Sequence, residues 1–273
     1  MMRGAVWLAG LFVAVVNVTA APYPPYPPHL PSLPYEPAQA SARSLTIAAA
    51  SDLQSVFPEI VSRFEHESGW KVTLTFGSSG NFFTQIENGA PFDLYFSADV
   101  DYPKRLDAEH LAEPGSLYEY AKGKIVIWAR SDSGVDPRKG LSVLLDPTVK
   151  KIAVANPEHA PYGRAAVAAL QHEQLYDKVR PKLVVGENIS QAAQFVQSGN
   201  AEAGILALSL ALTPALKQAG SYYEIPGRFY PPIEQGAIIL KSSANKDVAQ
   251  RFLTSMKRSD IKALMERFGF EAR

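Results

Sequence analysis

Short apolar runs rich in β-branched residues alternate with stretches of helical periodicity along most of the chain. Residues 45–48 read as a strand, and the apolar positions of residues 53–64 then recur on one helix face, which Gly69 ends. Residues 71–76 and 94–96 predict two further strands with a helix between them. The order strand-helix-strand-helix-strand predicts an α/β fold with a mainly parallel sheet.

The same alternation continues and predicts a second α/β unit. Its strands are expected at residues 124–129, 151–155, 183–185 and 205–208, and its helices at residues 163–175 and 190–197. A further strand at residues 237–240 precedes two helices centred on Phe252 and Leu264. These last elements need a sheet to cover, so we expect the chain to return to the first unit. The predicted domains are residues 43–121 plus 232–273 (domain I) and residues 122–231 (domain II).

The N-terminal residues predict export. Arg3 precedes an uncharged apolar run, residues 4–18, and small residues follow it, which is typical of a signal peptide over residues 1–20. The run is short for a membrane span; an uncleaved anchor helix is the alternative. Residues 21–42 contain PYPPYPPHLPSLPYEP, which predicts a polyproline-like tether, with a ligand for a proline-binding module as the alternative.

Composition narrows the possible compartments and partners. The chain has no cysteine, which excludes disulfides, cysteine metal sites and a thioether-linked lipid. With the export signal, this predicts a periplasmic protein. Lys plus Arg and Asp plus Glu number 27 each, so the net charge of zero argues against nucleic acid or an anionic membrane as the main partner.

Four places share one design, in which a strand ends, small or polar residues follow, and a helix begins. They are residues 50–52, 77–80, 161–163 and 187–190. A helix N-terminus carries unpaired N–H groups and a partial positive charge, so it attracts anions. Each turn alone is also what ordinary helix capping looks like. The four together, none with Lys or Arg, predict a site that binds a dehydrated anion through directed hydrogen bonds.

Several motifs make the chain resemble the periplasmic molybdate-binding proteins of ABC transporters. They are AAASDL (residues 48–53), FGSSG (76–80), IENGAPFDL (86–94), SAD (97–99), NPEHAPYG (156–163), GENI (186–189) and RFGF (267–270). The match covers nearly all of the chain after the tether.

The resemblance implies a two-domain periplasmic-binding-protein fold of type II, with the ligand cleft between the domains. It implies high-affinity binding of molybdate or tungstate and delivery to an inner-membrane ABC transporter permease. Ser51 and Ser79 match hydroxyl ligands, and Asp52 and Ile189 match main-chain N–H donors. Tyr162 matches the tyrosine of the Ala-Pro-Tyr-Gly motif. These residues would contact the oxyanion's oxygens, with no direct metal ligand and no cofactor, in a monomeric protein.

The sequence departs from the family pattern at one position and raises a question at another. Some relatives have a tyrosine ligand where this chain has Ala207. A carboxylate at Asp52 that pointed into the site would repel a dianion but could accept a proton from hydrogen phosphate. Because an unpaired buried carboxylate is costly, we expect the Asp52 side chain to turn outward, where it favours the helix dipole.

Three other functions are possible. The same fold could carry a sulfate-like oxyanion. It could also carry ferric ion, since the adjacent Tyr222 and Tyr223 could supply phenolates, although a strand position explains the pair equally. An enzyme could use Ser51 or Ser79 as nucleophile. The chain has no Gly-x-Ser-x-Gly elbow, and its histidines offer no evident base, since His159 reads as a loop residue.

Overall fold

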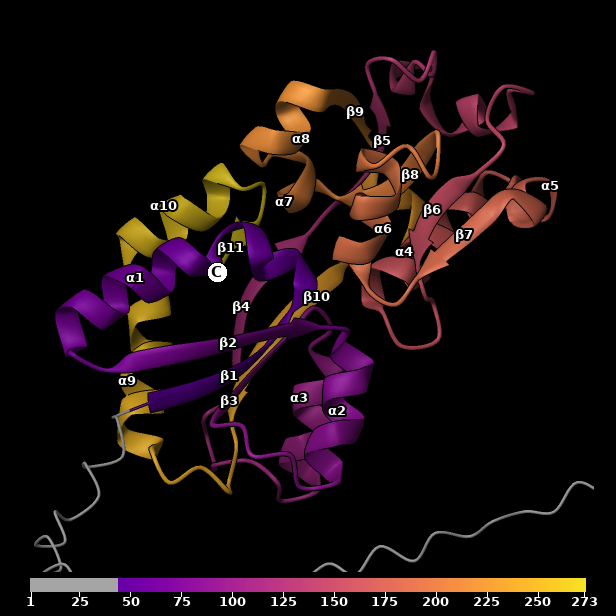
Figure 1. The fold of residues 1–273 in the computed structure, drawn as a ribbon. Helices are drawn as coiled ribbons and strands as arrows, with labels where there is room; N and C mark the ends of the chain where they lie inside the picture. The colour runs from indigo at the N-terminus through magenta and orange to yellow at the C-terminus, as the bar shows by residue number, and fades with distance from the viewer. Residues whose placement is uncertain (1–43) are drawn as a thin grey trace, which may run out of the picture. The chain divides into compact units, whose positions relative to one another are not determined.

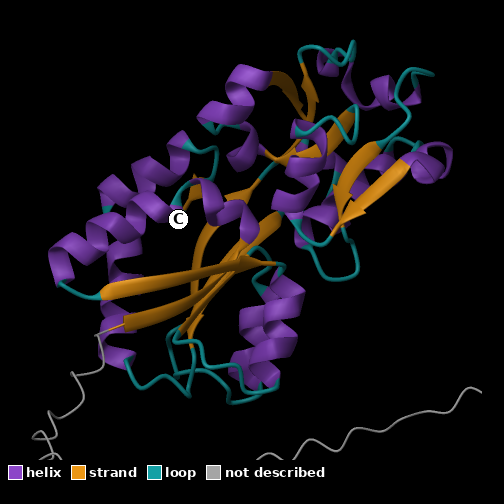
Figure 2. Ribbon diagram, in the orientation of Figure 1, coloured by secondary structure: helices purple, strands orange, loops and turns teal. Residues whose placement is uncertain are grey.

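The computed structural model describes residues 44–273. The predicted signal peptide (residues 1–20) and tether (residues 21–42) lie outside the described residues. Figure 1 shows two β-sheets, each accompanied by helices, and Figure 2 distinguishes these elements by type. None of the helices in residues 44–273 combines the length and the apolar character needed to cross a membrane.

The first sheet has six strands in the order β11-β4-β10-β3-β1-β2. Their bounds are β1 Ser44–Ala50, β2 Lys71–Gly77, β3 Leu94–Ser97, β4 Tyr118–Gly123, β10 Ile233–Ile239 and β11 Glu271–Ala272. β1 runs parallel to both β2 and β3, whereas β10 runs antiparallel to β3 and β4. The early and late parts of the chain therefore share one sheet.

Helices cover both faces of the first sheet (Figure 1). They are α1 Phe57–Ser68, α2 Ser79–Glu87, α3 Asp101–Ala108, α9 Lys246–Met256 and α10 Ser259–Arg267. Alternate residues of β1 face opposite sides: Ile47 packs in the core with α1, α9 and α10, and Ala48 packs in the core with α2 and α3. Gly69 ends α1 in the left-handed conformation, with φ of 70°, as the sequence predicts.

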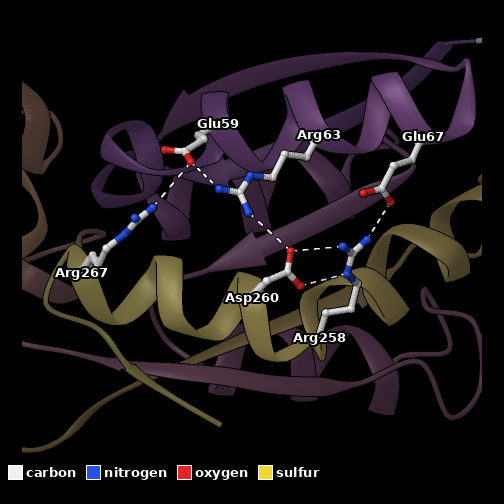
Figure 3. A network of polar contacts seen from close by, with 6 residues as sticks. All are labelled: Glu59, Arg63, Glu67, Arg258, Asp260 and Arg267. Atoms are coloured by element: carbon white, nitrogen blue, oxygen red, sulfur yellow. Dashed lines mark hydrogen bonds and ion pairs between the residues drawn. The ribbon is translucent and has the colours of Figure 1, made fainter.

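Charged side chains link the first helix to the C-terminal segment on the solvent side (Figure 3). Arg63 pairs with Glu59 at 2.6 Å and with Asp260 at 3.4 Å, and Arg258 pairs with Glu67 at 2.6 Å. All of these side chains are at least a third exposed, so each pair contributes little to stability. The network supplements the apolar contacts that hold α1 and α10 on the sheet.

The second sheet has five strands in the order β7-β6-β8-β5-β9. Their bounds are β5 Ile125–Arg130, β6 Ile152–Ala155, β7 Leu183–Gly186, β8 Ala203–Ala207 and β9 Gly220–Glu224. The helices of this part are α4 Pro161–His172, α5 Tyr176–Val179, α6 Ile189–Gln197, α7 Leu208–Ala211 and α8 Pro214–Ala219. The 3₁₀ segments of the structure are η1 Ser51–Ser55, η2 Pro137–Leu145, η3 Arg180–Lys182 and η4 Gly227–Phe229.

The expected α/β class and the two sheets flanked by helices are confirmed, but the expectation that each sheet is mainly parallel is wrong. Each sheet joins a parallel half to an antiparallel half. The first sheet is mixed because its fourth strand in sequence, β4, leaves for the second sheet and β10 returns antiparallel beside it. A local strand-helix alternation does not reveal the direction of a strand that returns from so far along the chain.

The chain changes sheet between Gly123 and Ile125 and changes back between Glu224 and Ile233. β4 thus runs two residues past residue 121, the predicted end of the first segment of domain I. The domain boundaries themselves stay a proposal, which limited proteolysis at the two connections would test.

Candidate functional site

One small cavity collects the four turns that the sequence singles out, together with the residue after β3. We call it the donor cavity. Its lining residues are Ala50, Ser51, Asp52, Gly77, Ser78, Ser79, Ala98, Ala160, Pro161, Tyr162, Asn188 and Ile189. The five residues predicted as ligands are all among them. The cavity volume is about 10 Å³, far below the roughly 300–1,000 Å³ of pockets for drug-sized molecules, so the cavity has no room for such a ligand.

The first sheet supplies two serine hydroxyls to the donor cavity. Ser51 begins η1 directly after β1, and Ser79 begins α2 after β2; both are buried. The Ala98 N–H donates to Ser79 Oγ at 3.0 Å, which leaves the hydroxyl hydrogen of Ser79 free to donate. Within residues 44–273, Ser51 Oγ has no hydrogen-bond partner in the protein. Both hydroxyls can therefore donate to a guest.

Three helices begin at the donor cavity, α2 from the first sheet and α4 and α6 from the second part. The first N–H groups of a helix have no carbonyl partner within it, so they are available to an anion. At α6, Asn188 Oδ1 accepts from the N–H groups of Ser190 and Gln191, both at 3.1 Å. The N–H of Ile189 does not take part in this cap, so it can donate to an anion. At α4, Ala160 provides no side-chain cap, so Tyr162 N–H is not satisfied that way.

The prediction that the Asp52 side chain turns outward is wrong; the side chain is fully buried. Oδ2 accepts hydrogen bonds from Tyr162 Oη at 2.8 Å and from Gln235 Nε2 at 2.7 Å. Gln235 Nε2 also lies 3.0 Å from Tyr162 Oη. Among residues 44–273, Oδ1 has no hydrogen-bond partner. The expectation is wrong because it used a local capping rule, whereas the donors come from α4 and β10, far along the chain.

Burial raises the pKa of Asp52 from 3.8 to about 6, although the hydrogen bonds from Gln235 and Tyr162 act in the opposite direction. The N–H groups of Asp52 and Leu53 also lower this pKa. Burial, and then the charge of Asp52, raise the pKa of the Tyr162 phenol well above its usual value. Tyr162 is therefore a neutral donor near neutral pH.

No Lys, Arg or His is among the described residues that line the donor cavity. His159 lies just outside it, where its carbonyl accepts from Ser78 Oγ at 2.6 Å and its Nδ1 lies 2.8 Å from the same oxygen. Arg164 forms an ion pair with Asp99. The site thus offers a guest hydroxyl and N–H donors without a cation.

Gln235 lies in none of the turns or motifs singled out from the sequence, whereas Ser78 and Asn188 lie in two of the four turns but were not expected as ligands. Gln235 is fully buried on β10 and touches both Asp52 and Tyr162. A glutamine inside a buried strand is a signal, since a buried amide needs partners, but it does not say which ones. Tyr222 and Tyr223, considered for ferric ion, lie on β9 at the edge of the second sheet and outside the donor cavity.

Comparisons of the sequence and of the structure with known proteins identify the same family. The profile of the bacterial extracellular solute-binding proteins matches residues 45–271. The molybdate-binding protein ModA of Rhodobacter capsulatus is 36% identical over 231 residues, which cover 85% of this chain and 89% of that protein. ModA of Azotobacter vinelandii is 37% identical over 231 residues, covering 85% and 91%.

A solved structure, the Azotobacter vinelandii periplasmic molybdate-binding protein, superposes with a TM-score of 0.78 at 35% identity. The match covers 83% of this chain and 98% of that one. A sulfate-binding protein from Mycobacterium tuberculosis, with a TM-score of 0.68 at 15% identity, shares the fold. The chain belongs to the bacterial extracellular solute-binding proteins, in the family of the molybdate-binding protein ModA.

Proposed function

We propose that this protein binds molybdate or tungstate in the periplasm and delivers it to an ABC transporter for uptake. The observation that carries the proposal is the donor cavity itself, in which hydroxyl and N–H donors converge without a cation. The names of the relatives agree with it, since the proteins from Rhodobacter capsulatus and Azotobacter vinelandii are both called molybdate-binding.

Neutral donors suit a tetrahedral oxyanion for a physical reason. Each oxygen of such an ion accepts hydrogen bonds in fixed directions, and N–H and O–H groups on rigid helix starts can be placed to meet them. The partial positive charge at the starts of α2, α4 and α6 supplies attraction where no side chain carries a formal positive charge. Release of the ion from the site also requires no buried salt bridge to be broken.

Each predicted residue has a role in this proposal. Ser51 and Ser79 donate their hydroxyl hydrogens to the ion, and Asp52, Tyr162 and Ile189 donate their main-chain N–H groups. The Tyr162 phenol already donates to Asp52 Oδ2, so we assign it to holding the carboxylate rather than to the ion. All of these groups contact oxygen atoms, and the metal atom of the oxyanion has no protein ligand.

Molybdate and tungstate have the same charge and nearly the same size, so we propose both as ligands. A sulfate-like oxyanion is the second candidate, favoured by the shared fold of the sulfate-binding protein. We propose no enzymatic activity. Ser78 is the cavity serine that contacts a histidine, and its hydroxyl donates to the His159 carbonyl, which does not prepare it as a nucleophile.

A thermal-shift panel with molybdate, tungstate, sulfate and phosphate tests the proposal. An ion present at about 1,000 times its Kd stabilises the folded protein by about 4 kcal/mol, which raises the melting temperature by several degrees. We expect this rise with molybdate and tungstate and a much smaller one with sulfate and phosphate. A rise with sulfate alone would assign the protein to the second candidate, and no rise with any ion would reject both.

A further inference from the structure

Asp52 places a carboxylate at the donor cavity, where the proposed function brings a dianion. It is the one carboxylate among the described residues that line this cavity. Its side chain is fully buried, and its two hydrogen-bond donors, Tyr162 and Gln235, are both neutral. Oδ1 has no hydrogen-bond partner within residues 44–273. A negative charge on this group would therefore be stabilised only by neutral donors, with no positively charged side chain among the described residues that line the cavity.

The surrounding elements bring no counter-charge to Asp52. β1, α6 and α7, which pack around η1, contain no ionisable residue. The charged residues of α1 and β2 are all partly or fully exposed; they are Glu59, Arg63, Glu65, His66, Glu67 and Lys71. From α4 and β4, Tyr162 and Tyr120 face it, and burial followed by the charge of Asp52 raises the pKa of each phenol.

Charged residues of α4, β4 and β10 are engaged in ion pairs of their own, among them Lys122 of β4, which pairs with Glu234. Arg164 of α4 pairs with Asp99, and Glu234 of β10 accepts from Arg273 at 2.8 Å. His159 contacts Ser78 rather than Asp52. No cation is thus available at Asp52 from the part of the chain that the structure describes.

We infer that Asp52 takes up one proton when a tetrahedral dianion enters the donor cavity, so that the complex holds a neutral carboxylic acid beside the ion. The inference rests on the proposed function. Two negative groups in one desolvated cavity repel each other strongly, which favours protonation of the weaker acid. A proton from solvent on Oδ1 removes this repulsion, while Oδ2 keeps its bonds from Tyr162 and Gln235.

The proton is easily acquired in this environment. Burial, partly offset by the hydrogen bonds, already brings the pKa of Asp52 to about 6 before any ion arrives. If the bound dianion moves this pKa above the working range, the affinity depends on pH only through the free protein. The dissociation constant should then rise about tenfold for each pH unit above 6 and stay nearly constant below it.

The experiment counts protons. Calorimetric titration of the mature protein with molybdate at pH 7, in two buffers with different ionisation enthalpies, should give uptake of about 0.9 proton per ion, since about nine-tenths of a group with a pKa near 6 is ionised there. Asp52→Asn, which cannot ionise, should bind without proton uptake and with a Kd that does not change between pH 6.5 and 8. His159→Gln is the matched control and should keep the uptake of the parent.

The outcomes separate this inference from the proposed function. Tight binding by the parent without proton uptake would overturn the inference and leave the proposed function standing. Uptake that survives in Asp52→Asn but disappears in His159→Gln would assign the proton to the histidine and overturn it too. If no variant binds molybdate, the proposed function fails first. Should Asp52→Asn not fold, the proton count of the parent and of His159→Gln still decides.

Discussion

Tyr162 Oη donates a 2.8 Å hydrogen bond to Oδ2 of Asp52, although the two residues belong to parts of the chain built on different sheets. Gln235, on the strand by which the chain returns to the first sheet, donates to the same oxygen at 2.7 Å. One buried carboxylate oxygen therefore joins η1, α4 and β10 at the wall of the donor cavity.

Replacing Tyr162 by phenylalanine should affect stability more than binding. The substitution leaves Asp52 Oδ2 with one donor instead of two, and the loss of a buried hydrogen bond to a charged group costs about 1–3 kcal/mol. Because we assign the phenol to Asp52 and not to the ion, the Kd for molybdate should change less than about tenfold. Urea denaturation and calorimetry measure the two effects. A large loss of affinity with unchanged stability would place the phenol on the ion.

Replacing either cavity serine by alanine should weaken binding without unfolding the protein. Ser51→Ala and Ser79→Ala each remove one donor to a buried anion, which is worth about 1.5–3 kcal/mol, or roughly a tenfold to hundredfold increase in Kd. Ser55→Ala is the control, since Ser55 lies in the same 3₁₀ turn, donates to the Asp52 carbonyl at 3.1 Å and does not line the donor cavity. Equal affinities for all three variants and the parent would contradict the assignment of Ser51 and Ser79 as ligands of the ion.

Asp52 also sets a pH dependence of stability in the absence of ligand. Its folded-state pKa of about 6 lies above the usual 3.8, so folding favours the protonated form. Its stabilising contribution is complete below about pH 3.8 and is lost as the pH rises through about 6. The free energy of unfolding of Asp52→Asn should therefore increase relative to that of the parent as the pH rises, up to a limit of about 3 kcal/mol near neutral pH. Denaturation curves between these pH values would show the trend, and a constant difference would contradict it.

Gly123 leaves room for the cluster of Asp52, Tyr162 and Gln235. A Cβ atom at Gly123 would lie 2.2 Å from Tyr162 Oη and 2.8 Å from Gln235 Nε2. Gly123→Ala should cost about 1–3 kcal/mol, as overpacked buried positions do, and lower the melting temperature by several degrees. Gly227→Ala is the control, because a Cβ there meets nothing within 4 Å. Equal melting temperatures for the two variants would show that the cluster accommodates the added methyl group without loss of stability.

Local sequence patterns were enough to predict most of the fold. The apolar spacing before Gly69 predicted α1, and the apolar run of residues 94–96 predicted β3, because both signals come from neighbouring residues. β4 was not predicted; its sequence, YEYAKG, mixes charged and aromatic residues, and its pairing with β10 joins residues more than 100 positions apart. The direction of β10 depends on the same distant pairing, so local patterns do not predict it.

The site was predictable in its membership but not in its internal contacts. Strand-to-helix turns and family motifs indicated Ser51, Ser79 and Ile189, since both signals are carried by short segments. The orientation of Asp52 was not predictable, because its partners lie 110 and 183 residues further along the chain. Only the folded arrangement of α4 and β10 decides that this carboxylate turns inward.

The central claim is that neutral donors alone bind a tetrahedral oxyanion in the donor cavity. Calorimetric titration of the mature protein with molybdate at low and at high ionic strength tests it most directly. Buried hydrogen bonds are screened far less by salt than exposed charge pairs, so we predict one ion per chain and nearly the same Kd in both conditions. A Kd that collapses in high salt, or the absence of any binding heat and any displaceable ion, would contradict the account.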